Sequence, residues 1–116
     1  MVRGRGYVPE RGDLVWVDFD PQAGHEQAKR RPALVLSRSA YNVRAGLFLI
    51  CPVSSKIKGY PFEVALSAGG TISGVVLADQ VKSFDWSARS VAFIEKVPAS
   101  VLDQVSIFAA GIVVGK

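Results

Sequence analysis

Two short polar segments of this 116-residue chain carry side chains that could act on a phosphate. In the first, Lys29, Arg30 and Arg31 stand directly before Pro32. A proline holds the residue before it extended, and a guanidinium offers a planar fork of donors, so Arg31 suits bidentate binding of a phosphate. The segment leading to it, residues 20–32, is about 12 residues long, a length at which an irregular connection is more often functional than not. An anion-binding loop is predicted here, although Lys29 and Arg30 could equally be solvated surface charges.

The second segment, residues 52–59, ends an apolar run and reads Pro-Val-Ser-Ser-Lys-Ile-Lys-Gly. Hydroxyl and ammonium groups this close together can donate to phosphate oxygens and stabilise negative charge that develops in a transition state. Gly59 permits close approach of the backbone. By itself the pattern is weak, because serines followed by lysines at a strand end most often form an ordinary turn.

Other kinds of active site fit the sequence less well. One histidine and one cysteine, His25 and Cys51, are too few for a structural zinc site, and a lone cysteine forms no internal disulfide. A serine-hydrolase nucleophile elbow is missing, and the Gly-rich stretch 69–74 lacks the lysine of a phosphate-binding P-loop. Cys51 stands inside an apolar run and is interpreted as a small core residue. Zinc fingers and disulfide scaffolds are therefore excluded, and no cofactor is predicted.

The elements that must position these segments are mainly β-strands. At 49% apolar residues, the chain is long enough to bury about two-thirds of its surface, which predicts a single domain over residues 1–116 with one core. Five or six short strands at close spacing favour a small antiparallel barrel or sandwich. The runs that predict them, separated by Gly, Pro, Asn and Ser, are Leu14–Phe19, Ala33–Ser37, Leu47–Val53, Phe62–Leu66, Val75–Ala78 and Val91–Val97.

Only the C-terminal end of the chain has a helical pattern. Ser100 is the predicted N-cap, and Asp103 follows near the positive end of the helix dipole. The apolar residues that recur at helical spacing cover much of the circumference, more than one small barrel needs. Either this helix packs deep into the core or part of it meets another subunit. The apolar positions are Val101, Val105, Phe108 and Ile112, flanked by Leu102, Ala109 and Val113.

The net charge of +4 is unevenly distributed along the chain. Residues 1–60 contribute +5 and residues 61–116 contribute −1. The basic surface therefore belongs to particular segments and suits a polyanionic partner, the alternative being a solubilising surface. The first residues lack the apolar core of a signal peptide, and the longest apolar stretch, 105–114, is about half the roughly 20 residues that span a bilayer. A cytoplasmic protein without membrane association is expected.

Five stretches, taken in order, closely resemble the MazF/PemK family of toxin endoribonucleases. Each is a weak signal alone, but the ordered set is specific and covers nearly the whole chain. The stretches are residues 12–21 (GDLVWVDFDP), 24–27 (GHEQ), 31–37 (RPALVLS), 58–64 (KGYPFEV) and 76–83 (VLADQVKS).

The resemblance implies an SH3-like β-barrel of the MazF/CcdB type with a C-terminal helix, assembled as a homodimer. It also implies the toxin of a type II toxin-antitoxin system, an endoribonuclease that cuts single-stranded mRNA at short motifs without a metal and so blocks translation and growth. The partner implied for such a toxin is a MazE-like antitoxin whose acidic tail covers the RNA groove.

The family's catalytic Arg and Thr correspond by this resemblance to Arg31 and Ser54. The RNA 2′-OH attacks the neighbouring phosphorus and leaves a 2′,3′-cyclic phosphate and a free 5′-OH. Arg31 would stabilise the more negative phosphate, and Ser54 would donate to a non-bridging or leaving oxygen. His25, Glu26 and Lys58 are further candidates for proton transfer or phosphate contact. An arginine is always protonated and is a poor general base, so the acceptor of the 2′-OH proton is left open.

Unpaired bases need stacking and hydrogen-bonding partners on the loops that flank the groove. By position these candidates are Arg30, Lys56, Asn42, Phe19 and Gln80, with Phe19 equally suited to the core.

Two positions depart from the family pattern. Ser54 keeps the hydroxyl of the usual Thr but lacks the methyl group that restricts its side-chain torsion. His25 stands where some members carry Ser, and is either a titrating participant or a passive loop residue.

Two alternatives to an endoribonuclease stay open. One is a non-enzymatic poison on the same barrel, like the CcdB relatives that bind DNA gyrase, which would not need Arg31 and Ser54. The other is an inactive RNA-binding barrel, favoured if Ser in place of Thr abolishes turnover. The cleavage motif cannot be read from these residues.

Overall fold

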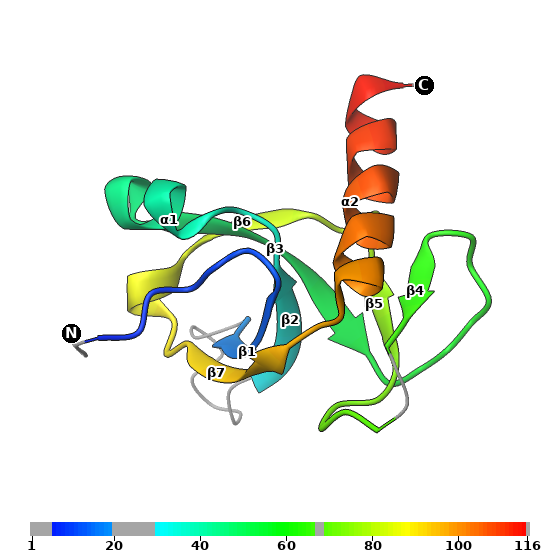
Figure 1. The fold of residues 1–116 in the computed structure, drawn as a ribbon, viewed down its shortest axis with the longest axis horizontal. Helices are drawn as coiled ribbons and strands as arrows, with labels where there is room; N and C mark the ends of the chain where they lie inside the picture. Colours follow the sequence, from blue (N-terminus) through cyan, green and yellow to red (C-terminus); the bar gives the residue numbers. More distant parts are fainter. Residues whose placement is uncertain (1–5, 20–29, 67–68, 116) are drawn as a thin grey trace.

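The computed structural model describes residues 6–19, 30–66 and 69–115 of the chain. Seven strands and two α-helices alternate with short turns (Figure 1). In chain order they are β1 (Asp13–Asp18), β2 (Arg30–Val35), α1 (Ser39–Ala45), β3 (Leu47–Ser54), β4 (Glu63–Ala65), β5 (Val75–Leu77), β6 (Lys82–Asp85), the 3₁₀ turn η1 (Trp86–Ala88), β7 (Ala92–Lys96) and α2 (Ala99–Val114).

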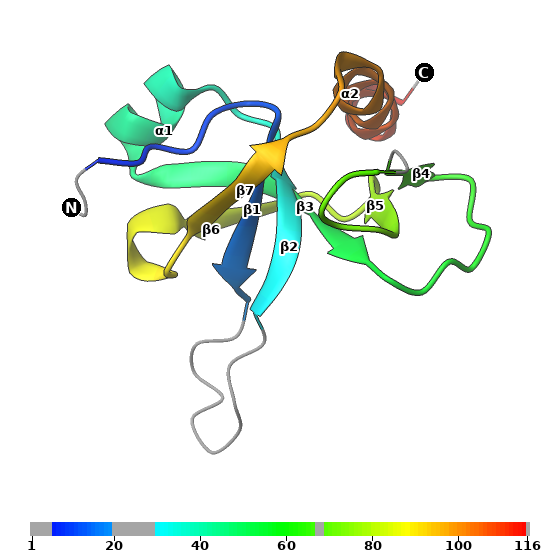
Figure 2. The ribbon, with the colours of Figure 1, turned by 60° about the horizontal axis from the view of Figure 1, so that its bottom comes forward.

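All strand pairs are antiparallel, and β3, the longest strand, is the hub of the sheet. It pairs with β2, β5 and β6. Six strands follow the order β4-β5-β3-β2-β1-β7, and β6 lies off this path, paired with β3. The strands wrap around one another rather than lying flat (Figure 2). The predicted mainly β fold with a C-terminal helix is confirmed. The pairing among the described strands nevertheless runs as an open path from β4 to β7 and does not close a barrel.

Each of the six predicted strands is present, with ends that differ from the predicted ones by at most three residues. The largest shift is at β2, which begins at Arg30 because residues 30–32 pair with the end of β1. The sequence prediction missed β6, whose four residues include a single large apolar side chain, Phe84. This strand exists because it pairs with β3, where Phe48 lies opposite Phe84.

The helix α1 was also missed, since the Tyr41-Asn42 pair suggested a turn. Its N-cap residue, Arg38, makes no capping bond with its side chain. Instead the Glu10 carboxylate, far away in sequence, accepts a hydrogen bond of 2.6 Å from the Ser39 backbone N–H. A residue remote in sequence therefore caps α1, which no local pattern could reveal.

Asn42 is fully buried inside this arrangement, so its predicted contact with RNA bases is wrong. Its side-chain amide donates to the backbone carbonyls of Pro9 at 2.8 Å and Ser37 at 3.1 Å, and its Oδ1 accepts from the Ser37 hydroxyl. The indole of Trp86 donates to the Asn42 carbonyl. Asn42 therefore joins α1 to the N-terminal segment and to η1.

The central strands carry buried side chains on both faces. Alternate residues of β1 and β2 enter two separate clusters, because successive side chains of a strand point to opposite faces. The cluster on the α2 side includes Leu14, Leu34, Cys51, Val76 and Val105. The other includes Val15, Val17, Val35, Phe48 and Ile50, closed by Phe84 and Trp86.

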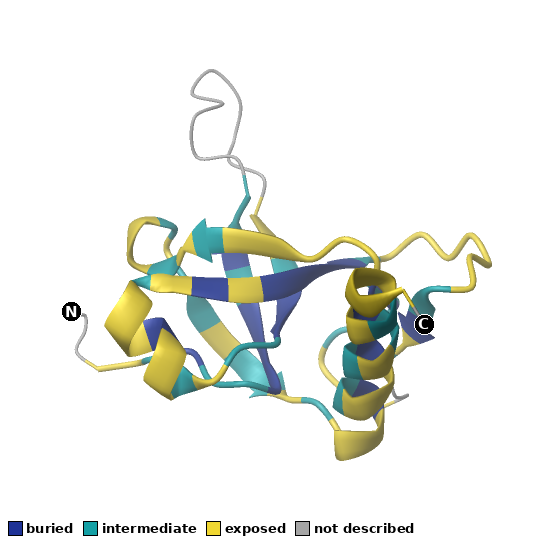
Figure 3. Ribbon diagram, turned by 90° about the horizontal axis from the view of Figure 1, so that it is seen from above, coloured by how far each residue is buried: buried dark blue, intermediate teal, exposed yellow. Residues whose placement is uncertain are grey.

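Helix α2 lies against the first cluster through one stripe of its surface. Val101, Val105 and Ala109 are buried, whereas the last turn is exposed (Figure 3). The predicted start at Ser100 is corrected to Ala99, with Pro98 as N-cap residue and no side-chain cap. Among the described residues, no helix has the length and apolar character needed to span a membrane.

Candidate active site

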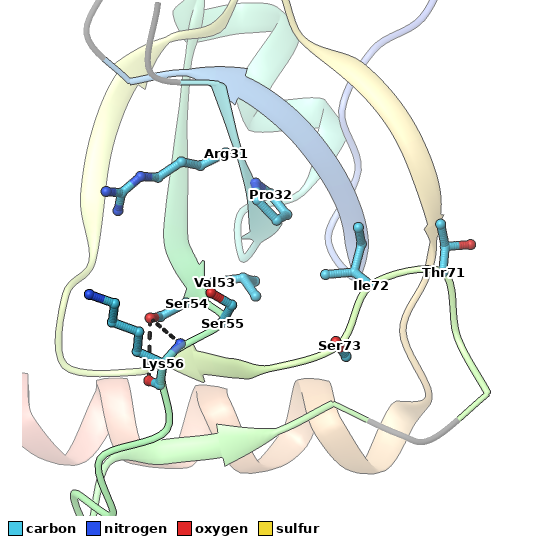
Figure 4. A pocket seen from close by; sticks show the side chains of 9 residues that line it. All are labelled: Arg31, Pro32, Val53, Ser54, Ser55, Lys56, Thr71, Ile72 and Ser73. Carbon is cyan, nitrogen blue, oxygen red and sulfur yellow. Dashed lines mark hydrogen bonds between the residues drawn. The ribbon is translucent and has the colours of Figure 1, made fainter.

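Arg31 on β2 and Ser54 at the end of β3 line one open cleft of about 530 Å³ (Figure 4). Its other lining residues are Pro32, Val53, Ser55, Lys56, Thr71, Ile72 and Ser73. The pairing of β2 with β3 ends at Ala33 and Pro52, two residues short of Arg31 and Ser54, and Ser54 pairs with Val75 of β5 instead.

The Ser54 hydroxyl is held by a local turn at the end of β3. Its Oγ accepts a hydrogen bond of 3.0 Å from the Lys56 backbone N–H and donates one of 3.3 Å to the Lys56 carbonyl. The longer bond is the weaker one, and a hydroxyl proton can rotate to a better acceptor. The turn therefore fixes the oxygen while leaving its proton available to a phosphate.

Two cationic side chains reach the same part of the cleft. Arg31 comes from β2 and Lys56 from the turn after β3, and Figure 4 shows both extending to the same side. Both residues are exposed. Their placement beside Ser54 concentrates positive charge where the sequence predicted phosphate binding.

The opposite wall of the cleft comes from the Gly-rich stretch 69–74, which the sequence analysis considered only as a P-loop and rejected because it lacks the lysine. Thr71, Ile72 and Ser73 belong to the connection between β4 and β5 and line the cleft. The available signal was two hydroxyl side chains in a Gly-rich connection between two predicted strands. These residues are far from Ser54 in the sequence, so the sequence pattern did not indicate that they share a cleft with it.

Two predicted cations lie outside the cleft lining. The Arg30 guanidinium lies over the Trp16 ring, with 5.7 Å from Cζ to the ring centroid. The Lys58 ammonium lies 5.9 Å from the Tyr60 ring centroid, and the Lys58 backbone N–H donates to Glu63. Both cations are exposed and flank the cleft without entering it.

The remaining candidates are also separate from the cleft lining. Phe19 is partly buried and meets Phe84 edge-to-face, with 5.3 Å between ring centroids, which favours its core interpretation. Gln80 is exposed in the connection between β5 and β6. His25 and Glu26 lie outside the described residues.

Cys51 is not among the residues that line the cleft. Cys51 is fully buried, and burial raises the pKa of its thiol to about 12, so the thiolate form is suppressed. This confirms the interpretation of Cys51 as a core residue. Within ranges 6–19, 30–66 and 69–115, no three His, Cys, Asp or Glu residues are placed to hold a metal ion.

With this geometry in view, comparison with known proteins identifies the family. A family model described as "PemK-like, MazF-like toxin of type II toxin-antitoxin system" matches residues 10–108. The chain belongs to this PemK/MazF family. A curated member, the endoribonuclease toxin MazF of Escherichia coli strain K12, is 59% identical over 83 residues, covering 72% of this chain and 74% of the relative. The endoribonuclease PemK of Escherichia coli is 36% identical over 100 residues, covering 83% and 75%.

Solved structures of PemK/MazF proteins match nearly the entire chain. MazF from Deinococcus radiodurans superposes with a TM-score of 0.85 at 53% identity, covering 96% of this chain and 100% of that one. A MazE-MazF complex from the same organism gives a TM-score of 0.87 at 54% identity, covering 95% and 98%. The predicted MazF-type architecture is therefore confirmed at the level of the whole fold.

Proposed function

We propose that this chain is the toxin of a type II toxin-antitoxin system and an endoribonuclease that cleaves single-stranded RNA, with Arg31 and Ser54 as its catalytic pair. The observation that carries the proposal is that these two residues, from β2 and β3, line one open cleft together with Lys56. Family membership supplies the reaction class, since the relatives in question are named endoribonucleases.

The cleft residues suit a transesterification. The 2′-OH of one nucleotide attacks its neighbouring phosphorus, the bond to the 5′-oxygen breaks, and the products are a 2′,3′-cyclic phosphate and a 5′-OH. Arg31 binds two non-bridging oxygens through its fork, and Ser54 donates to a non-bridging or leaving oxygen. Lys56 adds positive charge beside them. These groups lower the barrier because they are oriented before the phosphate becomes more negative.

The reaction also needs an acceptor for the 2′-OH proton. The described cleft lining consists of Arg, Lys, Ser, Thr and apolar residues, and none of these side chains ordinarily titrates near neutral pH. His25, Glu26 and Lys58 stay candidates for proton transfer or phosphate contact, and the acceptor of the 2′-OH proton is left open. pH–rate profiles of variants at these positions show which residue accepts the proton.

Single-stranded RNA and an antitoxin are the proposed partners, and the working state is a homodimer in the cytoplasm. The Deinococcus radiodurans relative has been solved as a MazE-MazF complex. A MazE-like protein with an acidic segment would complement the cations at the cleft and block the approach of RNA.

The deciding experiment incubates the purified protein with a long single-stranded RNA in EDTA and maps the new 5′ ends. We expect cleavage at a short recurring motif, with 5′-OH ends, at the same rate with and without EDTA. No cleavage above background would favour the gyrase-poison or inactive-barrel alternatives. Cleavage only after metal addition would reject the proposed mechanism.

A further inference from the structure

We propose that Glu95, on the edge strand β7, is a positioning residue for Ser54 that acts through the 69–74 segment. The inference rests on the proposed function, because it assigns Glu95 a role in orienting a proposed catalytic group. Glu95 itself is not part of the cleft that holds Arg31 and Ser54.

The first link joins Glu95 to Thr71. The Thr71 backbone N–H donates to both carboxylate oxygens, at 3.1 and 3.3 Å, and the Thr71 hydroxyl donates to Oε1 at 3.1 Å. Hydrogen bonds to an ionised carboxylate are stronger than those between neutral groups. A single side chain on β7 thus restrains both the backbone and the side chain of Thr71.

A second hollow of about 260 Å³ lies between the 69–72 stretch and the end of β7, and its lining comprises Leu66, Gly69, Gly70, Ile72 and residues 95–98. The two glycines bring no side chains to fill this space. The Glu95 carboxylate makes a polar contact with Thr71 beside this hollow.

The second link joins the other end of the segment to Ser54. Gly74 has a φ of +124°, and a Cβ atom at this position would collide with the Ser54 carbonyl oxygen. The next residue, Val75, pairs with Ser54 in the sheet, and the Gly74 carbonyl accepts from the Leu66 N–H at 3.0 Å. The segment therefore ends in direct backbone contact with the residue that carries the proposed catalytic hydroxyl.

Between the two links, Ile72 packs against the core and Ser73 faces the cleft. Loss of the Glu95 bonds would free the Thr71 end and let the backbone at Gly74 shift against Ser54. A displacement of about 1 Å in a catalytic group can reduce a rate about 100-fold.

The test compares Glu95→Ala, Glu95→Gln and the control Asp103→Ala, which removes an exposed acid of α2. On a short RNA that contains the mapped cleavage site, Glu95→Ala should lower kcat between about tenfold and 100-fold with KM within about twofold. Glu95→Gln keeps an acceptor for Thr71 and should stay within about threefold of the parent protein. Asp103→Ala should match the parent. A rise in KM alone, or Glu95→Gln as slow as Glu95→Ala, would overturn the proposal.

A double mutant separates this route from a general loss of stability. In a Ser54→Ala background, Glu95→Ala should slow the residual reaction by less than about twofold, because groups acting as one unit are not additive. A further tenfold loss in that background would show that Glu95 does not act through Ser54.

A measurement independent of activity keeps the proposal testable if the parent protein cuts no RNA. The Lys56 backbone N–H donates to Ser54 Oγ and so reports on that hydroxyl. Glu95→Ala should shift the Lys56 amide resonance and accelerate amide exchange across residues 69–76, while Asp103→Ala leaves both unchanged. Absence of cleavage would reject the proposed function alone, and an unmoved Lys56 amide would reject the positioning role.

Discussion

Arg31 and Ser54 bring different chemistry to the same phosphate, and substitutions can separate the two. Arg31→Ala should lower kcat/KM at least about 100-fold, the scale of removing one preorganised donor to a developing oxyanion. Arg31→Lys should restore little, because an ammonium lacks the planar fork. Single-turnover cleavage of a short RNA measures both variants. Arg44→Ala, which removes an exposed cation from α1, is the matched control, and full activity in Arg31→Ala would reject the assignment.

Two substitutions of Ser54 test its role, one expected to lower the rate and one expected to keep or raise it. Ser54→Ala removes the hydroxyl and should also cost about 100-fold in rate. Ser54→Thr keeps the hydroxyl and restricts its torsion, so the rate should equal or exceed that of the parent protein. The same single-turnover assay decides, and an unimpaired Ser54→Ala enzyme would exclude Ser54 from the reaction.

At the scale of elements, the N-terminus of α1 is capped by Glu10, a residue outside the helix. The Ser39 backbone N–H holds the pKa of the Glu10 carboxyl below its usual value, ahead of smaller contributions from Arg11 and Lys96. A carboxylate whose pKa is lower in the folded state stabilises the fold above its unfolded pKa, near 4.5, and loses this effect as the pH falls through the folded value.

Glu10→Ala should therefore destabilise the protein at pH 7 by about 1 kcal/mol, the typical value of a helix cap. The corresponding fall in the unfolding midpoint is about 4–8 °C for a domain of this size. Thermal unfolding between pH 7 and 3 measures the effect, and the difference between variant and parent should shrink below about pH 4.5. A difference that stays constant with pH would contradict the cap.

For the molecule as a whole, charge distribution makes a quantitative prediction. A dimer of this chain has a formal charge of +8, since each chain carries +4. RNA affinity should fall steeply with salt, and Lys56→Ala should reduce the slope of log K against log salt by about 0.7 if Lys56 contacts one phosphate. Fluorescence anisotropy with the Ser54→Ala protein avoids cleavage during the titration. A salt-independent affinity would exclude a phosphate-dominated interface.

The assembly state follows from the apolar surface of α2. Ile107, Val113 and Val114 are 64%, 82% and 67% exposed in the single chain, more than a helix of a monomer ordinarily leaves uncovered. Sedimentation at micromolar concentration should give about twice the 12.4 kDa of one chain. A species of 12.4 kDa alone would contradict the dimer.

Sequence alone determined six of the seven described strands, the C-terminal helix, the inert buried Cys51 and the selection of Arg31 and Ser54 as candidates. Strand alternation and helical spacing are short-range patterns, so they can be read without knowledge of the fold. Arg31 and Ser54 were identified as candidates from the resemblance to a family and from the chemistry of phosphate binding. Both arguments depend only on which residue types occur and in which order.

Tertiary structure decided which residues share the site. It buried Asn42, placed Arg30 over Trp16 and brought Thr71 and Ser73 to the cleft beside Ser54. It also created α1 and β6, which depend on Glu10 and on β3 rather than on their own sequences. Burial, strand register and capping from a distance are set by contacts between residues far apart in the chain, and a local pattern contains no information about those partners.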